Sequence, residues 1–386
     1  MLNELEGAGL LGLPYAMRLS GYWALGCMAL AGSMASWTGW ALAECMYDER
    51  GQRVRTKYDE VGRDTYGERG QRLVLLVQMC NLVAVGVVYL VLIGSTMHAV
   101  HPIVSNTELP WLSHADQRLW TLVAVLFVLP TVHIGGYRKL ALLSALGIGC
   151  LMAIIVVGLA CSARVISDNG GVAAVPELDW HHLPAVFSMF VFAFSAHGIF
   201  PDLKASMRDP ELFSNVIGVV FAVNVALKIL FTTACFFAWG GDTQAVVSAN
   251  FSHGERLVVS ILIAANTWLS FPLPLIPVFR NLKSGLESRG WVITATREAL
   301  IRTVVVLCCG AVAFSIPNFA VAMGFMGSIT LSFLTFIFPA TFYLKLHYDR
   351  CGALTVFWAG LVIIVGVVGG IAGVVSTAAL ASKPPA

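Results

Sequence analysis

Two stretches of the sequence decide the fold, residues 6–15 (EGAGLLGLPY) and residues 194–202 (FSAHGIFPD). Each places glycine, proline and polar residues inside an apolar segment, where an uninterrupted membrane helix would carry aliphatic side chains. Irregular backbone at membrane depth leaves N–H and C=O groups without partners, which costs several kcal/mol for each group unless it faces a cavity or a ligand. The two stretches therefore predict two interrupted membrane helices whose main chain can bind a ligand.

The composition places these stretches in a membrane protein. Of the 386 residues 58% are hydrophobic and 12% are charged, and the mean hydropathy is +0.79. An average soluble domain carries about 25% charged residues, so this composition excludes ordinary soluble enzymes, nucleic-acid binders and secreted disulfide modules. The net charge of +2 predicts no nucleic-acid partner. The nine cysteines form no CxxC pair, so we interpret them as packing residues and expect no metal site.

Eleven apolar segments are predicted to be membrane helices. They cover residues 5–19, 22–46, 73–98, 119–133, 140–161, 185–207, 213–239, 256–282, 300–316, 319–346 and 354–380. A span takes about 20 apolar residues, so the first segment is too short to cross alone. We therefore expect an all-α integral membrane protein whose first helix is truncated.

The placement of Lys and Arg predicts the orientation of these segments. Eighteen of the chain's 24 Lys and Arg residues fall in alternate loops, and Lys228 lies inside a segment. Because cytosolic loops carry an excess of positive charge, we expect the N-terminus in the cytosol and the C-terminus on the opposite side. In the most basic loop, residues 56–66 predict a short cytosolic helix that lies against the helix bundle.

The two interrupted segments hold corresponding positions in two halves of five helices each. We place these repeats at about residues 1–161 and 185–346, with an eleventh helix at residues 354–380, all in one transmembrane domain. A matched pair of interrupted segments is the best sequence indication of an inverted-repeat transporter site. The alternative is that both are ordinary glycine and proline kinks, because both residues are common in membrane helices.

A free amino acid would suit such a pair of segments, because it carries both a carboxylate and an ammonium group. The positive N-terminal end of the second half of helix one, at Gly9 and Leu10, can bind the carboxylate. Free carbonyl groups near Gly7 and around Ser195 and Ala196 can accept hydrogen bonds from the ammonium. The sequence thus predicts an amino acid site formed largely by main-chain groups.

The same segments resemble those of the amino acid/auxin permease family of secondary transporters. Residues 7–16 read GAGLLGLPYA, with Asn3 four residues before the first glycine, and residues 196–213 read AHGIFPDLKASMRDPELF. Further stretches similar to vesicular and vacuolar members of this family are residues 227–251, 269–275 and 316–330. Family members have an N-terminal tail before the first motif and lack acidic residues where this chain has Glu4 and Glu6, which again suggests a truncated start.

The resemblance implies a leucine-transporter-like fold of two inverted five-helix repeats plus an eleventh helix. It also implies alternating access and proton-coupled movement of small neutral amino acids across a vacuolar, lysosomal or vesicular membrane rather than the plasma membrane. We expect a monomer in the bilayer, with no cofactor other than a proton or sodium gradient. The predicted substrate-binding residues are Asn3, Gly7, Ala8, Gly9, Leu10, Ser195, Ala196, His197 and Gly198.

Four residues are candidates for coupling to an ion. His197 titrates near neutral pH and could carry a proton, or could be a fixed hydrogen-bonding residue. Lys228 lies mid-helix, where a charge costs about 2.5–3.5 kcal/mol; it could pair with a buried carboxylate such as Glu44, bind an inorganic anion, or extend to the membrane interface. Glu6 is a second proton candidate, and the Ser270 hydroxyl could form a sodium site or cap its helix.

Three polar residues on other segments could also line the site, or could be packing residues. These weaker candidates are Asn81, Tyr89 and Ser328.

Other functions are open at this point. The same fold could couple to sodium, or the chain could sense amino acids without transporting them. A channel would require a continuous polar face along several helices, and polar clusters occur here in the first, sixth and eighth segments. An integral enzyme is disfavoured, because the membrane segments contain no HExxH, GxSxG or Walker motif.

Overall fold

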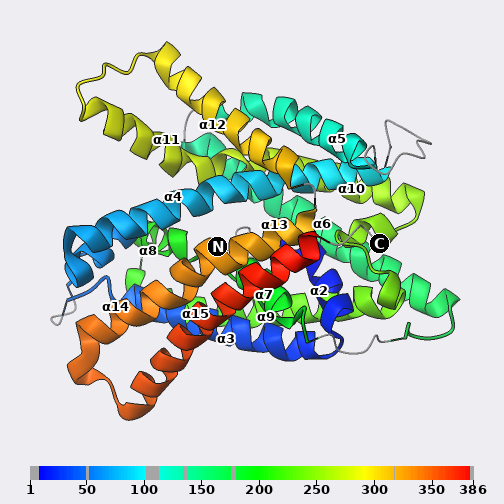
Figure 1. The fold of residues 1–386 in the computed structure, drawn as a ribbon, viewed down its shortest axis with the longest axis horizontal. Coiled ribbons are helices and arrows are strands. Elements are labelled where there is room, and N and C mark those ends of the chain that lie inside the picture. Colours follow the sequence, from blue (N-terminus) through cyan, green and yellow to red (C-terminus); the bar gives the residue numbers. More distant parts are fainter. Residues whose placement is uncertain are drawn as a thin grey trace. The chain divides into compact units, whose positions relative to one another are not determined.

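The computed structural model of the chain (Figure 1) describes residues 8–48, 52–100, 113–133, 137–174, 180–207, 209–316 and 318–382. Over these residues the chain forms helices and turns and no strand, apart from an isolated bridge between Tyr47 and Arg53. The prediction of an all-α protein is therefore confirmed.

Each of the eleven predicted segments coincides with one helix or with several helices joined end to end. In the first half these are η1 (Ala8–Gly12, a 3-10 helix), α2 (Leu13–Ser20), α3 (Trp23–Glu44), α4 (Tyr58–Val100), α5 (Ser113–Val128), η2 (Leu129–His133) and α6 (Tyr137–Asp168). The second half holds α7 (Leu183–Ala193), η3 (His197–Ile199), α8 (Phe200–Ser206), η4 (Pro210–Leu212), α9 (Phe213–Trp239), η5 (Gly240–Asp242), η6 (Val247–Asn250), α10 (His253–Ser270), α11 (Pro272–Glu287), α12 (Ala295–Ser315), α13 (Phe319–Met326), η7 (Gly327–Ile337, a π-helix), α14 (Phe338–His347) and η8 (Tyr348–Arg350). The last helix is α15 (Ala353–Ala381).

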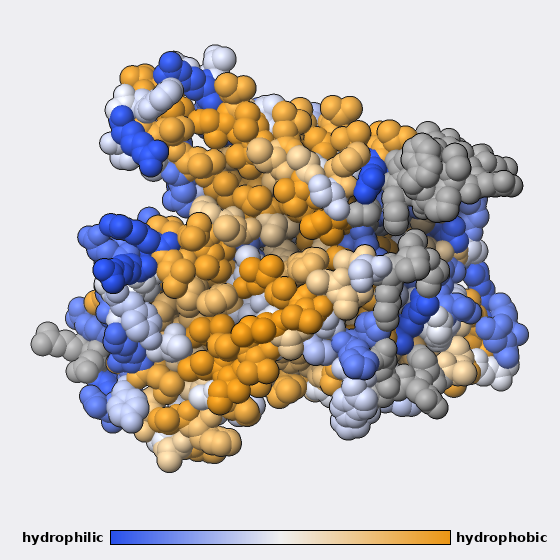
Figure 2. Space-filling model, viewed as in Figure 1, coloured by the Kyte–Doolittle hydropathy of each residue, from blue (hydrophilic) through white to orange (hydrophobic). Residues whose placement is uncertain are grey.

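Among the described residues, seven helices are long and apolar enough to cross a membrane unaided. Residues 117–133 and 183–199 form shorter apolar helices. Apolar side chains stay exposed on the outer face of α15, for example Phe357, Ile364, Ile371 and Val375, and Figure 2 shows a continuous hydrophobic surface over this helix. Such a surface suits contact with lipid chains.

The chain divides into two compact units, each assembled from several separate stretches. The first unit comprises Met1–Asn81, Pro176–Thr232 and Met323–Ala386, and the second comprises Leu82–Val175 and Thr233–Ala322. The first unit contains both predicted interrupted segments.

In the first unit α7 is the central helix, because η1, α2, α3, η7 and α15 all pack against it. Small polar side chains join these helices closely. Ser328 of η7 donates a hydrogen bond to the Ser188 hydroxyl of α7 at 2.9 Å, and Ser376 of α15 donates to the His181 carbonyl at 2.6 Å. Ser328, a predicted lining candidate, therefore joins two packed helices and is 3% exposed.

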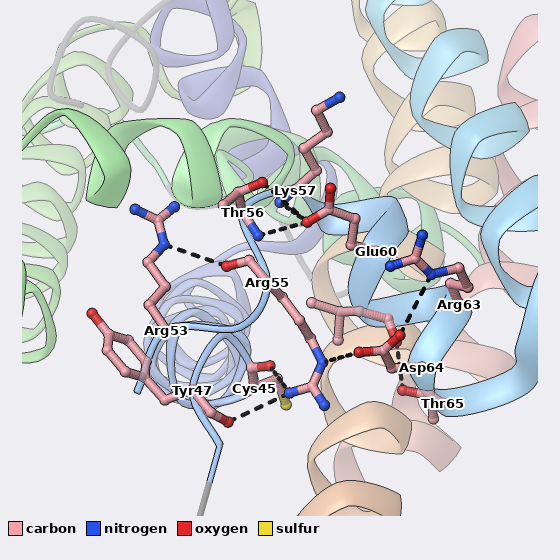
Figure 3. Close-up of polar contacts among 11 residues, drawn as sticks. Cys45, Tyr47, Arg53, Arg55, Thr56, Lys57, Glu60, Arg63, Asp64 and Thr65 are labelled. Carbon is pink, nitrogen blue, oxygen red and sulfur yellow. Dashed lines mark hydrogen bonds and ion pairs between the residues drawn. The ribbon is translucent and has the colours of Figure 1, made fainter. Parts of the chain in front are cut away.

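The predicted short helix at residues 56–66 is present. It forms the start of α4, which is interrupted at Tyr66 and at Gly67, where a φ of 68° favours glycine. Figure 3 shows how polar contacts hold it beside the end of α3: Arg55 donates to the Cys45 carbonyl and to the Asp64 carboxylate, both at 2.8 Å. Tyr58, on its buried face, donates to the Leu334 carbonyl of the π-helix at 2.7 Å.

The second unit is built around the pairing of α6 with α10. The start of α10 has a capping box. The Ser252 side chain accepts a hydrogen bond from the Glu255 backbone N–H, and the Glu255 carboxylate accepts one from the Ser252 backbone N–H. Glu255 also forms an ion pair with Arg164 of α6 at 2.7 Å. In the same unit Arg302 of α12 donates to the Val132 carbonyl at 2.7 Å.

Candidate substrate and ion site

The sixth predicted membrane segment is broken where its sequence predicted. The helix α7 ends at Ala193, and Ala196 has a non-helical φ of −141° and ψ of 12°. A short 3-10 turn follows, and α8 begins at Phe200 with Pro201 in its first turn. Proline is well tolerated there because the first turn of a helix has no use for its missing N–H.

The first membrane segment also departs from a regular α-helix. Gly9 and Leu10, predicted at the N-terminal end of the second half-helix, lie in the 3-10 helix η1, and the α-helix α2 begins only at Leu13. Pro14 in the first turn of α2 explains this start, since proline favours that position. The predicted residues Asn3, Glu6 and Gly7 lie outside the described part of the chain, and Ala8 is the first residue of η1.

The two irregular segments lie against each other. A Cβ atom at Gly9 would come within 3.2 Å of the Ala193 Cα and of the Phe192 ring. A side chain at residue 9 would therefore have to displace one of these neighbours, and glycine suits this close approach of helix one to the end of α7. The part of Gly9 in substrate binding stays a prediction.

His197 is held by α3. Its Nε2 lies 3.0 Å from the Thr38 hydroxyl and 3.1 Å from the Ala35 carbonyl oxygen. A carbonyl only accepts hydrogen bonds, so Nε2 carries the hydrogen and Nδ1 carries the lone pair of the neutral ring. The side chain is completely buried, and Nδ1 has no hydrogen-bond partner among the residues that the structure describes. The ring also packs 4.8 Å from the Phe200 ring, centroid to centroid.

Lys228 of α9 reaches the break between α7 and α8. Its Nζ donates to the Ala193 carbonyl, the last residue of α7, and to the Asn224 side-chain oxygen at 2.9 Å. The same nitrogen lies 4.7 Å from the centre of the Phe194 ring. The side chain is completely buried, so the alternative in which it extends to the membrane interface is wrong.

Several residues that contact the break were not predicted. Gln78 of α4 donates to the Gly198 carbonyl at 3.0 Å, and the Ser195 and Thr335 hydroxyls lie 2.7 Å apart. Gln78 occupies a polar position inside an apolar segment, which was a usable signal. The hydroxyl of Thr335 gave no such signal, because serine and threonine are frequent in membrane helices as packing residues.

The weaker lining candidates differ in their surroundings. In the first unit Asn81 accepts a hydrogen bond from Thr330 at 3.1 Å. Tyr89 is 8% exposed and lies in the second unit.

Ser270, the candidate for sodium, lies in the second unit at the end of α10. It is 2% exposed and donates to the Asn266 side-chain oxygen at 3.1 Å. The chain continues through Phe271, whose backbone angles are helical (φ −52°, ψ −42°), into Pro272 at the start of α11, so the predicted helix consists of α10 and α11 joined end to end. Its part in ion coupling stays a prediction.

Comparison with known proteins shows what class of molecule contains this arrangement. Residues 1–381 match the model of a family described as transmembrane amino acid transporter protein. The chain belongs to this family. Amino acid transporter AVT1D of Arabidopsis thaliana is 27% identical over 97% of this chain and 67% of its own length. The vesicular inhibitory amino acid transporter of Xenopus tropicalis is 26% identical over 97% of the chain and 74% of its own, and the vesicular GABA transporter of Caenorhabditis elegans is 26% identical over 89% and 70%.

A solved structure shows the fold of this family member. An inward-facing structure of Mhp1 matches with a TM-score of 0.52 and 12% identity, over 98% of this chain and 90% of the other. The fold is therefore the leucine-transporter-like one that the sequence predicted. The resemblance to the amino acid/auxin permease family is confirmed, and the protein is a multi-pass membrane transporter of amino acids rather than an enzyme.

Proposed function

We propose that this protein is a secondary active transporter of small neutral amino acids that works by alternating access and is driven by protons. The observation that carries the proposal is the contact between the two irregular segments, where Gly9 lies against the last residue of α7. Such a junction offers the carbonyl end of one half-helix and the N-terminal end of another, which suit the ammonium and the carboxylate of one substrate.

The proposed substrate groups bind at different ends of this junction. The substrate carboxylate accepts hydrogen bonds from backbone N–H groups of helix one around Gly9 and Leu10, together with Asn3, Gly7 and Ala8. The substrate ammonium donates hydrogen bonds to carbonyl groups of Ser195, Ala196 and Gly198, with His197 beside them. The names of the relatives support small neutral substrates, since they include transporters of inhibitory amino acids and of GABA.

Proton coupling is supported by the environment of His197. Its Nδ1 lone pair is buried and is not used by any hydrogen bond among the described residues. This atom is therefore the one that a proton would bind, while Nε2 keeps its contacts with Thr38 and Ala35. Glu6 is the second candidate. Coupling to sodium through Ser270 is the alternative within the same fold.

We further propose a vacuolar, lysosomal or vesicular membrane, a cytosolic N-terminus and a monomer as the working unit. The vacuolar or vesicular location follows the names of the vesicular relatives, and the orientation follows the alternating positive charge of the loops.

The test is uptake by purified protein in proteoliposomes. Labelled glycine, alanine, GABA, glutamate and lysine are offered with an imposed pH gradient of either polarity, in sodium or choline buffer. We expect the neutral substrates to accumulate with one polarity of the gradient and equally in both buffers. No uptake of any of the five, by protein that stays monodisperse, would contradict transport; uptake that requires sodium would support the alternative.

Two glycine variants provide a matched control for the site. Gly9→Val places a branched side chain against Ala193 and should abolish uptake. Gly26→Val introduces the same side chain in α3, where a Cβ atom meets nothing within 4 Å, and should retain uptake.

A further inference from the structure

We propose that the Lys228 ammonium takes the place of a bound monovalent cation at the broken end of α7. The proposal rests on the proposed function. It adds that this transporter needs no bound sodium ion at the end of α7, because the lysine supplies the positive charge there. It differs from the roles expected for Lys228 from the sequence, a carboxylate partner or an anion site.

The Lys228 ammonium lies at the C-terminal end of α7. The last carbonyl groups of a helix have no partner within the helix and carry the negative end of its dipole. In α7 the carbonyl of the last residue, Ala193, accepts a hydrogen bond from Lys228 Nζ. The C-terminal end of α7 thus attracts a positive charge, and the Lys228 side chain of α9 supplies that charge.

Groups that can bind a cation surround the Lys228 nitrogen. A main-chain carbonyl oxygen and the Asn224 amide oxygen both contact Nζ, and the face of the Phe194 ring lies 4.7 Å away. Neutral oxygen atoms and an aromatic face are ligands that hard monovalent cations share with an ammonium group. Asn224 lies four residues before Lys228 on α9, so one helix supplies both the charge and a ligand for it.

Lys228 and Asn224 are both completely buried. Loss of the ammonium removes a buried hydrogen-bond donor from the Ala193 carbonyl and from the Asn224 side-chain oxygen, which is unfavourable unless another cation or donor replaces it. Conversely, while the ammonium is present, a second cation at the same oxygens is excluded by repulsion at low dielectric. The wild-type protein should therefore ignore sodium at this position, and a variant without the charge should accept it.

The experiment measures thermal unfolding of the purified full chain in detergent, in 150 mM chloride salts of sodium, lithium, potassium or choline. The test variants are Lys228→Ala, which opens space for an ion, and Lys228→Gln, which keeps the volume without the charge. We expect the wild-type midpoint to be equal in all four salts. The midpoint of Lys228→Ala should be lower in choline and rise by about 2–4 °C in sodium or lithium. Lys228→Gln should show a smaller rise.

Two further variants test the ligands and the specificity of the effect. Lys228→Ala combined with Asn224→Leu removes one oxygen ligand and should lose the sodium response. Lys204→Ala removes another buried lysine, whose Nζ contacts the Ala43 carbonyl and lies 4.1 Å from the Tyr47 ring centre. It should be destabilised equally in every salt. A response as large as that of Lys228→Ala would overturn the proposal, since it would show a general effect of salt.

Uptake provides a second measurement. Wild-type uptake should be equal in sodium and choline, and Lys228→Ala should transport only in sodium or lithium. The proposal is overturned if Lys228→Ala unfolds at the same midpoint in all four salts, which would leave the lysine as a helix cap alone. If neither the wild type nor any variant transports, but sodium still raises the unfolding midpoint of Lys228→Ala, the proposed function fails while the cation site stands.

Discussion

The buried contact between Thr38 and His197 contributes a measurable share of the stability of the site. Thr38→Val keeps the size of the side chain and removes the hydroxyl that lies 3.0 Å from His197 Nε2. The Ala35 carbonyl at 3.1 Å remains as an acceptor, so the imidazole N–H is not left without a partner. The loss is therefore that of one net hydrogen bond, about 0.5–1.5 kcal/mol, rather than the larger cost of an unpaired buried donor. The hydroxyl's own bond to the Met34 carbonyl, at 2.9 Å, is a local helix contact of little net value.

The assay is a double-mutant cycle on thermal stability, supported by the pH profile of uptake. Thr38→Val, His197→Gln and the double variant are compared, with Thr38→Ser as the control that keeps the hydroxyl. We expect a coupling energy of about 1 kcal/mol between the two positions. We also expect a shifted pH profile for Thr38→Val and an unchanged one for Thr38→Ser. A coupling energy near zero, with the pH profile of Thr38→Val equal to that of the wild type, would refute the role of Thr38 in holding the His197 ring.

Three further changes have defined outcomes. His197→Ala should flatten the pH dependence of uptake by the proteoliposomes; a wild-type profile with normal expression would remove its role as proton carrier. Tyr58→Phe leaves the Leu334 carbonyl without its 2.7 Å partner, so the free energy of unfolding should fall by about 1–3 kcal/mol without altering which amino acids are taken up. Ser270→Ala loses its bond to Asn266 and should leave uptake unchanged when sodium is replaced by choline; an uptake defect seen only in sodium buffer would favour the sodium alternative.

Much of the fold was predictable because the signals were local. The break in helix six was visible as FSAHGIFPD, where small and polar residues precede a proline that suits a helix start. The short helix before α4 was visible as a mixed polar and apolar stretch. Its junction with the membrane span needed a positive φ, and Gly67 is the residue in the sequence that supplies it. These features depend on neighbours within a few positions, which sequence patterns can report.

The boundaries of the first helix were harder to predict. Gly9 and Leu10 were expected to begin the second half-helix, but a 3-10 turn covers them and the α-helix starts at Leu13. The preference of proline for the first turn of a helix was the signal that favoured the later start. The π-helix at Gly327–Ile337 had no local signal at all, because its residues are ordinary for a membrane α-helix.

The partners of the buried polar residues could not be predicted, because they are distant in sequence. Thr38 lies 159 residues from His197, and Ala193 lies 35 residues from Lys228. In the second case the partner atom is a main-chain carbonyl, which every residue possesses, so nothing in the sequence marks Ala193. Sequence could therefore single out the titratable residues, but the structure was needed to say which atom each one contacts.

Three cations in the first unit show a common physical rule. Lys204 donates to the Ala43 carbonyl and Arg55 to the Cys45 carbonyl, both at the end of α3, and Lys228 donates to the carbonyl that ends α7. A positive charge at a helix C-terminus contributes up to about 2 kcal/mol in a partly buried geometry. The end of α3 can take its charge from a basic loop close by in sequence, as Arg55 shows. The end of α3 also takes a charge from a distant helix, through Lys204 of α8, and the end of α7 takes its charge from α9, through Lys228. Because a helix C-terminus attracts any positive charge, a lysine side chain and a bound monovalent cation are alternatives for the same place.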